Sequence, residues 1–277
     1  MSAEDANARY LRQASRRVIE PCEMSEDASA PSGWAEAAAA WIADMGEQGD
    51  YSRACVLDRP MLERIHGRRF ATALDVGCGE GRFCRMLQAA GISTVGIDPT
   101  EELLRQARRR DPKGDYRIGR AEALEFPDRS FDLVVSYLTL IDIGDIDRAV
   151  AEMARVLRPR GTLLIANLTS FATAGADGGW QPDSDGRLHF CIDHYLDERA
   201  EWVSWRRIRI KNWHRPLCRY MTLLLGAGLT LTHFDEPAPN SGDPDTADRY
   251  RRVPWFLLME WEKNRGPGTA RITEARR

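Results

Sequence analysis

The sequence is poor in lysine, nearly balanced in charge and free of long apolar stretches. Its only lysines are Lys113, Lys211 and Lys263, so arginine supplies nearly all of the 39 basic residues, and 42 acidic residues leave a net charge of −3. That balance gives no basic field for a nucleic acid or an anionic membrane. No apolar run approaches the ~18 residues of a membrane helix, and the polar, acidic N-terminus is unlike a signal peptide. We therefore expect a cytoplasmic protein without a nucleic-acid or membrane partner.

Paired cysteines are also missing. The six cysteines are scattered and form no C-x-x-C pair. They are Cys22, Cys55, Cys78, Cys84, Cys191 and Cys218. This pattern argues against a disulfide framework and against a zinc site, and it favours buried free thiols in a reducing compartment. We expect no metal.

The central part of the chain alternates short apolar runs with amphipathic stretches. At 277 residues, 43% of them hydrophobic and 29% charged, the chain is long enough to bury a substantial core. We expect strands at 72–77, 93–98, 115–119, 131–137 and 161–167, and helices at 80–90, 100–110 and 145–157. This alternation predicts an α/β fold in which right-handed βαβ units build a parallel sheet with helices on both faces.

A glycine-rich turn follows the first of these strands. Residues 73–82 read A-L-D-V-G-C-G-E-G-R, with glycines at 77, 79 and 81. Such glycines allow a tight turn and the close approach of a ligand to the N-terminus of the next helix. A dinucleotide fingerprint would place its third glycine at position 82, where this chain has Arg82. The spacing therefore disfavours a nicotinamide cofactor.

A carboxylate ends the next apolar run. Asp98 follows the sequence S-T-V-G-I at 93–97. A carboxylate at this strand end can accept hydrogen bonds from both hydroxyls of a ribose. The glycine turn and this spacing together predict a nucleoside-binding site.

With these motifs the chain resembles the class I, Rossmann-like S-adenosylmethionine-dependent methyltransferases, and most of all their ubiquinone/menaquinone-type small-molecule branch. The resemblance covers residues 51–263. The segments that carry it are 74–81 (L-D-V-G-C-G-E-G), 95–98 (V-G-I-D), 121–124 (A-E-A-L), 131–136 (F-D-L-V-V-S) and 157–161 (L-R-P-R-G). The resemblance implies a seven-stranded sheet in the order 3-2-1-4-5-7-6 with strand 7 antiparallel, and S-adenosylmethionine as the cofactor.

The resemblance also implies roles for residues around the turn. Gly77 and Gly79 would flank the methionine part of the cofactor, Asp98 would hold the ribose, and the backbone at Ala121 would meet the adenine. Ser136 and Tyr137 would lie beside the transferable methyl, and Tyr51 and Arg53 would face the methionine end. The full set of cofactor candidates is Tyr51, Arg53, Asp75, Gly77, Gly79, Asp98, Pro99, Ala121, Glu122, Ser136 and Tyr137.

One of these candidates, Asp75, and the residue before Ala121 leave alternatives open. Asp75 could tie down the backbone N–H groups of the glycine turn or contact the cofactor directly. Arg120 stands where the family often has an aspartate that contacts the adenine amino group. Arginine has no acceptor, so that contact would come from Glu122, from a backbone carbonyl, or be absent.

The remaining segments are expected to surround this core. We divide the chain into an N-terminal helical extension (1–50), a cofactor-binding core (51–169), a cap insertion (170–212), a C-terminal part of the core (213–263) and a loose tail (264–277). Further helices are expected at 3–20, 32–45, 59–67 and 216–227, with a loop at 22–31. Further strands are expected at 188–195, 202–210, 229–235 and 253–261, the last two joined by a polar loop.

Three residues are candidates for acid–base work on the methyl acceptor. His214 opens a helix beside Pro216, His194 lies in a turn of the cap, and Asp142 follows the fourth strand of the core. A histidine near its ordinary pKa is a natural general base, although His214 could equally cap its helix or pack beside Trp213. The tryptophans of the cap could line an apolar acceptor pocket or form a small core.

The sequence thus predicts an enzyme that transfers a methyl group to an oxygen or nitrogen atom, or to a carbon atom, of a small organic metabolite by in-line displacement. Secondary or quinone metabolism would be its setting. The alternatives are an RNA-modifying methyltransferase and a cofactor-binding regulatory protein without turnover. The sequence leaves the oligomeric state open.

Overall fold

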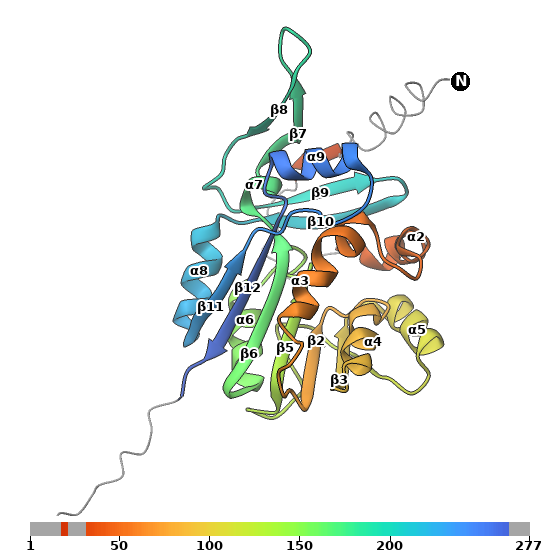
Figure 1. Cartoon of the computed structure of the whole chain (residues 1–277), viewed down its shortest axis with the longest axis vertical. Helices are drawn as coiled ribbons and strands as arrows, with labels where there is room; N and C mark the ends of the chain where they lie inside the picture. Colours follow the sequence, from red (N-terminus) through yellow and green to blue (C-terminus); the bar gives the residue numbers. More distant parts are fainter. Residues whose placement is uncertain (1–17, 22–31, 266–277) are drawn as a thin grey trace, which may run out of the picture.

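A seven-stranded sheet forms the centre of the computed structural model, which describes residues 18–21 and 32–265 (Figure 1). In spatial order it consists of β11 (Leu229–Asp235), β12 (Phe256–Lys263), β6 (Leu157–Leu168), β5 (Phe131–Tyr137), β2 (Thr72–Val76), β3 (Ser93–Asp98) and β4 (Asp115–Ile118). β12 runs antiparallel to both of its neighbours, and the strands from β6 to β4 are parallel. The predicted order and the antiparallel strand are confirmed.

Helices cover both faces of this sheet because each central strand is apolar on both sides. On one face, Leu74 and Val134 pack with α6 (Ile146–Val156) and α8 (Leu217–Gly226). On the other face, Ala73 and Leu133 pack with α3 (Asp58–Glu63) and α4 (Arg82–Ala89). α5 (Glu101–Arg110) packs beside α4 in a smaller cluster around Cys84. None of these or the other described helices is long and apolar enough to cross a membrane.

The strands and helices predicted for the core lie where they were expected, with one difference. β6 begins at Leu157 rather than at residue 161. Leu157 pairs with Phe131 before Arg160 turns the chain through a positive φ of 65°. The strand therefore begins before Pro159, which was expected to precede it.

The predicted helix at 3–20 is wrong for its last residues. Val18–Pro21 form strand β1, which pairs antiparallel with β9 (Arg199–Trp205). β-branched residues favour a strand, and Pro21 is tolerated because β1 is an edge strand. Residues 3–17, the expected loop at 22–31 and the tail from 266 lie outside the described residues.

The segment after β6 contains more strands than predicted. β7 (Gly175–Pro182) and β8 (Leu188–Ile192) form a hairpin. The single strand expected at 202–210 is in fact two strands, β9 and β10 (Ile208–His214), because Arg206 adopts a positive φ of 51° and Trp205 pairs with Ile208 across the turn. α7 (Ser170–Thr173) precedes the hairpins.

A further helix, α9 (Pro244–Arg252), interrupts the polar loop expected before β12. The Asp243 carboxylate caps it by accepting a hydrogen bond from the Thr246 N–H, and Pro244 opens the first turn. An aspartate followed by proline is a sequence signal for a helix start.

The N-terminal helix α2 (Trp34–Met45), predicted at 32–45, lies against β10. A π-helix, η1 (Ser52–Leu57), leads from it into α3, which is shorter than the helix expected at 59–67. In Figure 1, α2, β9 and β10 lie beyond the ends of β2, β5 and β6. The elements that cover this edge of the sheet therefore come from segments before and after the core in the sequence. The division into five segments stays a prediction.

Candidate active site

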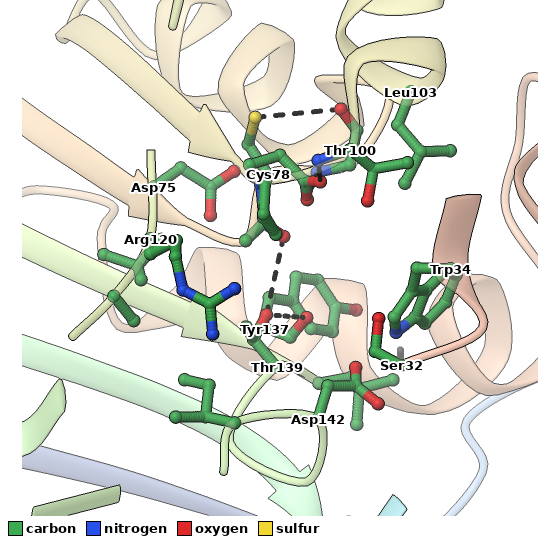
Figure 2. Close-up of a pocket in the computed structure, with 18 of the residues that line it drawn as sticks. Ser32, Trp34, Asp75, Cys78, Thr100, Leu103, Arg120, Tyr137, Thr139 and Asp142 are labelled. Carbon is green, nitrogen blue, oxygen red and sulfur yellow. Dashed lines mark hydrogen bonds between the residues drawn. The ribbon is translucent and has the colours of Figure 1, made fainter. Parts of the chain in front are cut away.

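A cavity opens where the carboxyl ends of β2, β3 and β5 meet, the edge at which open α/β sheets bind ligands. Its solvent-accessible volume is about 190 Å³. The loops after the strands form one side, and α2 and β10 contribute the other (Figure 2). The predicted cofactor residues that line it are Arg53, Asp75, Gly77, Gly79, Asp98, Pro99, Ala121, Glu122 and Tyr137.

The glycine turn is closed by backbone hydrogen bonds. The N–H groups of Gly77 and Cys78 both donate to the Ile97 carbonyl, at 2.8 and 2.9 Å. Gly77 has a φ of 74°, and a Cβ there would lie 2.2 Å from Cγ2 of Thr139. Only glycine fits this position without strain.

Asp98 lies at the end of β3, buried in the wall of the cavity. Its Oδ2 accepts a hydrogen bond from the Gly79 N–H at 3.0 Å, and its Oδ1 accepts one from the Thr100 N–H at 2.8 Å. Burial raises the pKa of Asp98, and these two donors oppose the shift. Each carboxylate oxygen keeps a lone pair that a ribose hydroxyl could donate to.

Asp75 offers an unused acceptor at the same wall. Its Oδ2 accepts a hydrogen bond from the Cys84 thiol at 3.3 Å, whereas its buried Oδ1 has no partner among the described residues. Burial raises the pKa of Asp75 to about 7. Orphaned buried acceptors are rare in folded proteins, and a donor on a bound ligand would satisfy this one.

The segment after β4, to which the resemblance assigns the adenine, also lines the cavity. Gly119, Arg120, Ala121 and Glu122 line the cavity, and the Arg120 guanidinium lies 3.2 Å from a Glu122 carboxylate oxygen. Glu122 is therefore an acceptor in the cavity wall, beside the arginine that departs from the family pattern.

Asp142 lies at the other end of the cavity. Figure 2 shows it beside Ser32 and Trp34, on the side away from Asp75. It accepts hydrogen bonds from the Asn212 side chain, at 2.7 Å, and from the Trp34 indole. Burial is the main cause that raises its pKa to about 8. Burial therefore favours the neutral, protonated form of this carboxyl group.

A network of charges supports the side of the cavity near η1. Arg53 lies over the rings of Trp41 and Tyr137, at 5.6 and 5.8 Å, and pairs with Asp50. Behind it, the Asp58 carboxylate accepts hydrogen bonds from Arg82 and from the Tyr137 hydroxyl, both at 2.9 Å.

Sequence analysis missed several residues of this cavity. They are Ser32, Trp34, Trp41, Met45, Arg82, Phe83, Thr100, Leu103, Thr139, Lys211 and Trp213, the last weighed only as part of a tryptophan cluster. Arg82 and Thr139 carried a signal, since they directly follow the glycine turn and β5. The residues of α2 and β10 carried none, because their position depends on contacts distant in sequence.

Four predicted residues lie outside the cavity lining, namely Tyr51, Ser136, His194 and His214. The Tyr51 ring packs on Tyr250 with centroids 5.2 Å apart, and its hydroxyl donates to the Ser241 carbonyl at 3.3 Å. Ser136 is fully buried within β5. His194 is exposed on the cap, where its Nδ1 lies 2.9 Å from an Asp197 carboxylate oxygen.

His214 also lies outside this cavity, in the wall of a smaller one behind Trp213. Its Nε2 lies 2.9 Å from the Tyr195 carbonyl, so this nitrogen carries a proton, and Nδ1 lies 2.7 Å from the Thr173 hydroxyl. Burial lowers the pKa of His214. We infer that this neutral imidazole supports the cap.

The sheet order, the glycine turn and the strand-end carboxylate together define a Rossmann-like enzyme that binds a nucleoside cofactor. Asp98, the orphaned oxygen of Asp75 and a glycine turn that lines the cavity fit S-adenosylmethionine, which carries a ribose and an ammonium group but no pyrophosphate.

Known proteins agree with this class. Residues 74–165 match the methyltransferase domain family. The chain is 31% identical over 214 residues to the malonyl-acyl-carrier-protein O-methyltransferase of Salmonella typhimurium, covering 74% of this chain and 80% of that protein. The Serratia marcescens protein of the same name is 32% identical over 145 residues, 51% of this chain and 56% of its own. A solved S-adenosylmethionine-dependent methyltransferase from Mesorhizobium loti has a TM-score of 0.66 and 26% identity, covering 79% of this chain and 100% of the other.

The chain therefore belongs to the class I, Rossmann-like S-adenosylmethionine-dependent methyltransferases. It is an enzyme of that class, and S-adenosylmethionine is its cofactor. The narrower resemblance to the ubiquinone/menaquinone-type branch stays a prediction.

Proposed function

We propose that this enzyme methylates an oxygen atom of a small organic acid, with a carboxylate as the acceptor. The charges at the end of the cavity away from the glycine turn carry this proposal. Lys211 lines the cavity, and its ammonium group lies 5.6 Å from the centre of the Trp202 ring, with no ion pair to a carboxylate among the described residues. Asp142, at the same end, has a pKa that burial raises to about 8, which favours its neutral form. An ammonium group and a neutral carboxylic acid together suit an anionic acceptor.

The names of the relatives support an oxygen acceptor. The proteins from Salmonella typhimurium and Serratia marcescens are both named O-methyltransferases of a malonyl group on an acyl carrier protein. A malonyl group attached at one end carries a free carboxylate at the other. The acceptor carboxylate could therefore belong either to a free acid or to the far end of an acyl thioester.

The residues of the cavity would act by holding and orienting the reactants. Bound S-adenosylmethionine supplies a methyl group already activated on a sulfonium. Asp98 and the glycine turn would hold the nucleoside end. Lys211 would pair with the acceptor carboxylate, and the protonated Asp142 would donate a hydrogen bond to it. A carboxylate has no proton to lose, so no general base is required. In-line positioning contributes roughly 7–11 kcal/mol to lowering such barriers.

Tryptophans complete the acceptor end. Trp34, Trp41 and Trp213 line the cavity from α2 and β10. Their large apolar surfaces would exclude water and strengthen the pairing of Lys211 with an anion.

Turnover with a panel of acceptors tests this proposal. The full chain is incubated with labelled S-adenosylmethionine and malonyl-coenzyme A, a free dicarboxylic acid, a phenol or an amine. We expect the carboxylates to be methylated in preference to the phenol and the amine. Preferential methylation of the phenol or the amine would contradict the assignment.

A matched pair of lysine variants tests the residue that carries the proposal. Lys211→Met should lower kcat/KM for the carboxylate about 10- to 100-fold, the value of one lost charge-assisted contact. Lys113→Met removes an exposed lysine that does not line the cavity and should leave kcat/KM unchanged. Equal activities of the two variants would show that Lys211 does not bind the acceptor.

A further inference from the structure

The loop that carries Asp142 is attached to the end of β10 by three residues, Asn212, Trp213 and Arg215. The Trp213 N–H donates to the Ile141 carbonyl at 2.6 Å. The next residue but one, Arg215, donates from its side chain to the carbonyls of Leu140, Ile143 and Gly144, at 3.2, 2.8 and 2.9 Å. Four of the five carbonyls of the loop at 140–144 are thus held from residues 213–215.

Arg215 is itself completely buried. Its Nε donates to a Glu198 carboxylate oxygen at 2.6 Å, Nη1 donates to Leu140, and Nη2 donates to Ile143 and Gly144. The guanidinium also lies 4.8 Å from the centre of the Trp213 ring, which lines the cavity. Burying a charge is costly unless it is paired and hydrogen-bonded, and here every nitrogen has a partner.

The loop held in this way exposes one polar side chain to the cavity. Asp142 lies between the carbonyls that Arg215 and Trp213 hold, and Asn212 donates to its carboxyl group at 2.7 Å. The backbone of the loop and the side chain of Asp142 are therefore both fixed from the segment 212–215.

We propose that Arg215 is a positioning residue for methyl transfer, which locks the loop at 140–144 to β10 and thereby holds Asp142 at the acceptor end of the cavity. The acceptor role of Asp142 rests on the proposed function, whereas the lock between Arg215 and the loop does not. Arg215 contacts neither the cavity nor the reacting groups and acts through Asp142.

The chemistry of arginine explains why this residue occupies the position. A planar guanidinium directs its N–H groups in fixed directions and can bind several carbonyls at once, whereas a lysine ammonium on a flexible stem cannot reproduce that geometry. A lysine at position 215 would keep the charge and loosen the loop. Arg215→Lys therefore separates the geometric role from the electrostatic one.

Arg219 provides a matched control. It is a nearby arginine on α8 that also pairs with Glu198, at 3.3 Å, but its other partner is Asp147 and it donates to no carbonyl of the loop. Arg219→Met removes a pairing with the same carboxylate and leaves the attachment of the loop intact.

The first measurement is the titration of Asp142 in the full chain, followed by carbon NMR of the labelled carboxyl groups. Its signal is assigned by its loss in Asp142→Asn. Besides burial, four groups shift the pKa of Asp142. Trp34 and Asn212 act as hydrogen-bond donors, Asp98 as a like charge and Arg53 as an opposite charge. Lys211 lines the same cavity. All of them are retained in the variants at positions 215 and 219.

We expect Arg215→Lys to lower the apparent pKa of Asp142 by about one pH unit or more, because a loosened loop admits water to the carboxyl group. Arg219→Met should leave the titration unchanged. An Arg215→Lys enzyme with the titration of the wild type would overturn the proposal. This readout needs no acceptor, so it stands apart from any failure of the proposed carboxylate substrate.

The second measurement is kinetics with malonyl-coenzyme A as the probe. Arg215→Lys should lower kcat about 10-fold, and Arg215→Met about 100-fold, with S-adenosylhomocysteine binding unchanged because the cofactor side is intact. Parallel losses of cofactor affinity and activity would show a general structural role and overturn the proposal. Should Arg215→Met fail to fold, the lysine variant decides the question by itself.

Discussion

Asp98 and Gly79 are joined by a hydrogen bond of 3.0 Å from the glycine N–H to the aspartate Oδ2. The carboxylate that we propose to bind the ribose therefore also fastens the glycine turn to the end of β3. Its second oxygen accepts from the Thr100 N–H at the start of α5. The site is thus held in its binding geometry by the same group that is proposed to bind the sugar.

Replacing Asp98 should abolish cofactor binding through both of these roles. Asp98→Ala removes the acceptors for the ribose and leaves the Gly79 N–H without its partner, so we expect S-adenosylhomocysteine affinity to fall at least about 100-fold. Isothermal titration calorimetry measures this. Asp115→Ala, at an exposed ion pair on the neighbouring strand, serves as the control. Unchanged affinity in Asp98→Ala would refute the assignment of the ribose site.

Gly77 should tolerate no side chain. A Cβ there would lie 2.2 Å from the Thr139 side chain, at a φ of 74°. We expect Gly77→Ala to lower the free energy of unfolding by roughly 2–4 kcal/mol, from strain and overpacking together. Gly67 has nearly the same φ, 75°, but nothing within 4 Å, so Gly67→Ala should cost only about 1 kcal/mol. Urea unfolding compares the two, and equal losses would show that the contact with Thr139 does not matter.

His214 should matter for stability more than for turnover. His214→Phe keeps a ring but removes the partners of the Tyr195 carbonyl and the Thr173 hydroxyl. We expect a loss of roughly 1–3 kcal/mol in the free energy of unfolding. Loss of a general base would lower kcat about 10²–10⁴-fold. Because His214 supports the cap and lies outside the active-site cavity, we expect kcat to stay within a few-fold of the wild type. A loss of rate on that scale in a variant of unchanged stability would make His214 the base after all.

The core of the fold could be predicted because its signals are local. Apolar runs of strand length, helices of period 3.6 and the glycine turn each lie within about ten residues of sequence. The position of Asp98 beside the glycine turn could be predicted for the same reason, since it follows from the end of a predicted parallel strand. The polar start of α9 has an equally local signal, in Asp243 and Pro244.

At the end of the cavity proposed for the acceptor, only Asp142 could be predicted, because the rest of this end is assembled from segments that are distant in sequence. Trp34 comes from the N-terminal helix, Asp142 from the loop after β5 and Lys211 from a strand after β6. Nothing in the sequence around His214 and Arg215 shows which of the two faces the core. The structure directs the arginine toward the loop at 140–144 and the histidine toward Thr173.

The pH dependence of stability should identify the protonated state of Asp142. Its pKa is raised from an ordinary 3.8 to about 8, so between these values the native state holds a proton that the unfolded chain has lost. Stability then falls as pH rises, by at most about 1.4 kcal/mol per pH unit. Asp142→Asn removes this dependence, while Asp75, also raised, is present in both proteins and cancels in the difference. Urea unfolding from about pH 5 to about pH 8 should therefore show the variant gaining stability over the wild type as pH rises. Parallel curves would mean that Asp142 is already ionised in the folded enzyme, and the hydrogen bond proposed from Asp142 to an acceptor carboxylate would be lost with it.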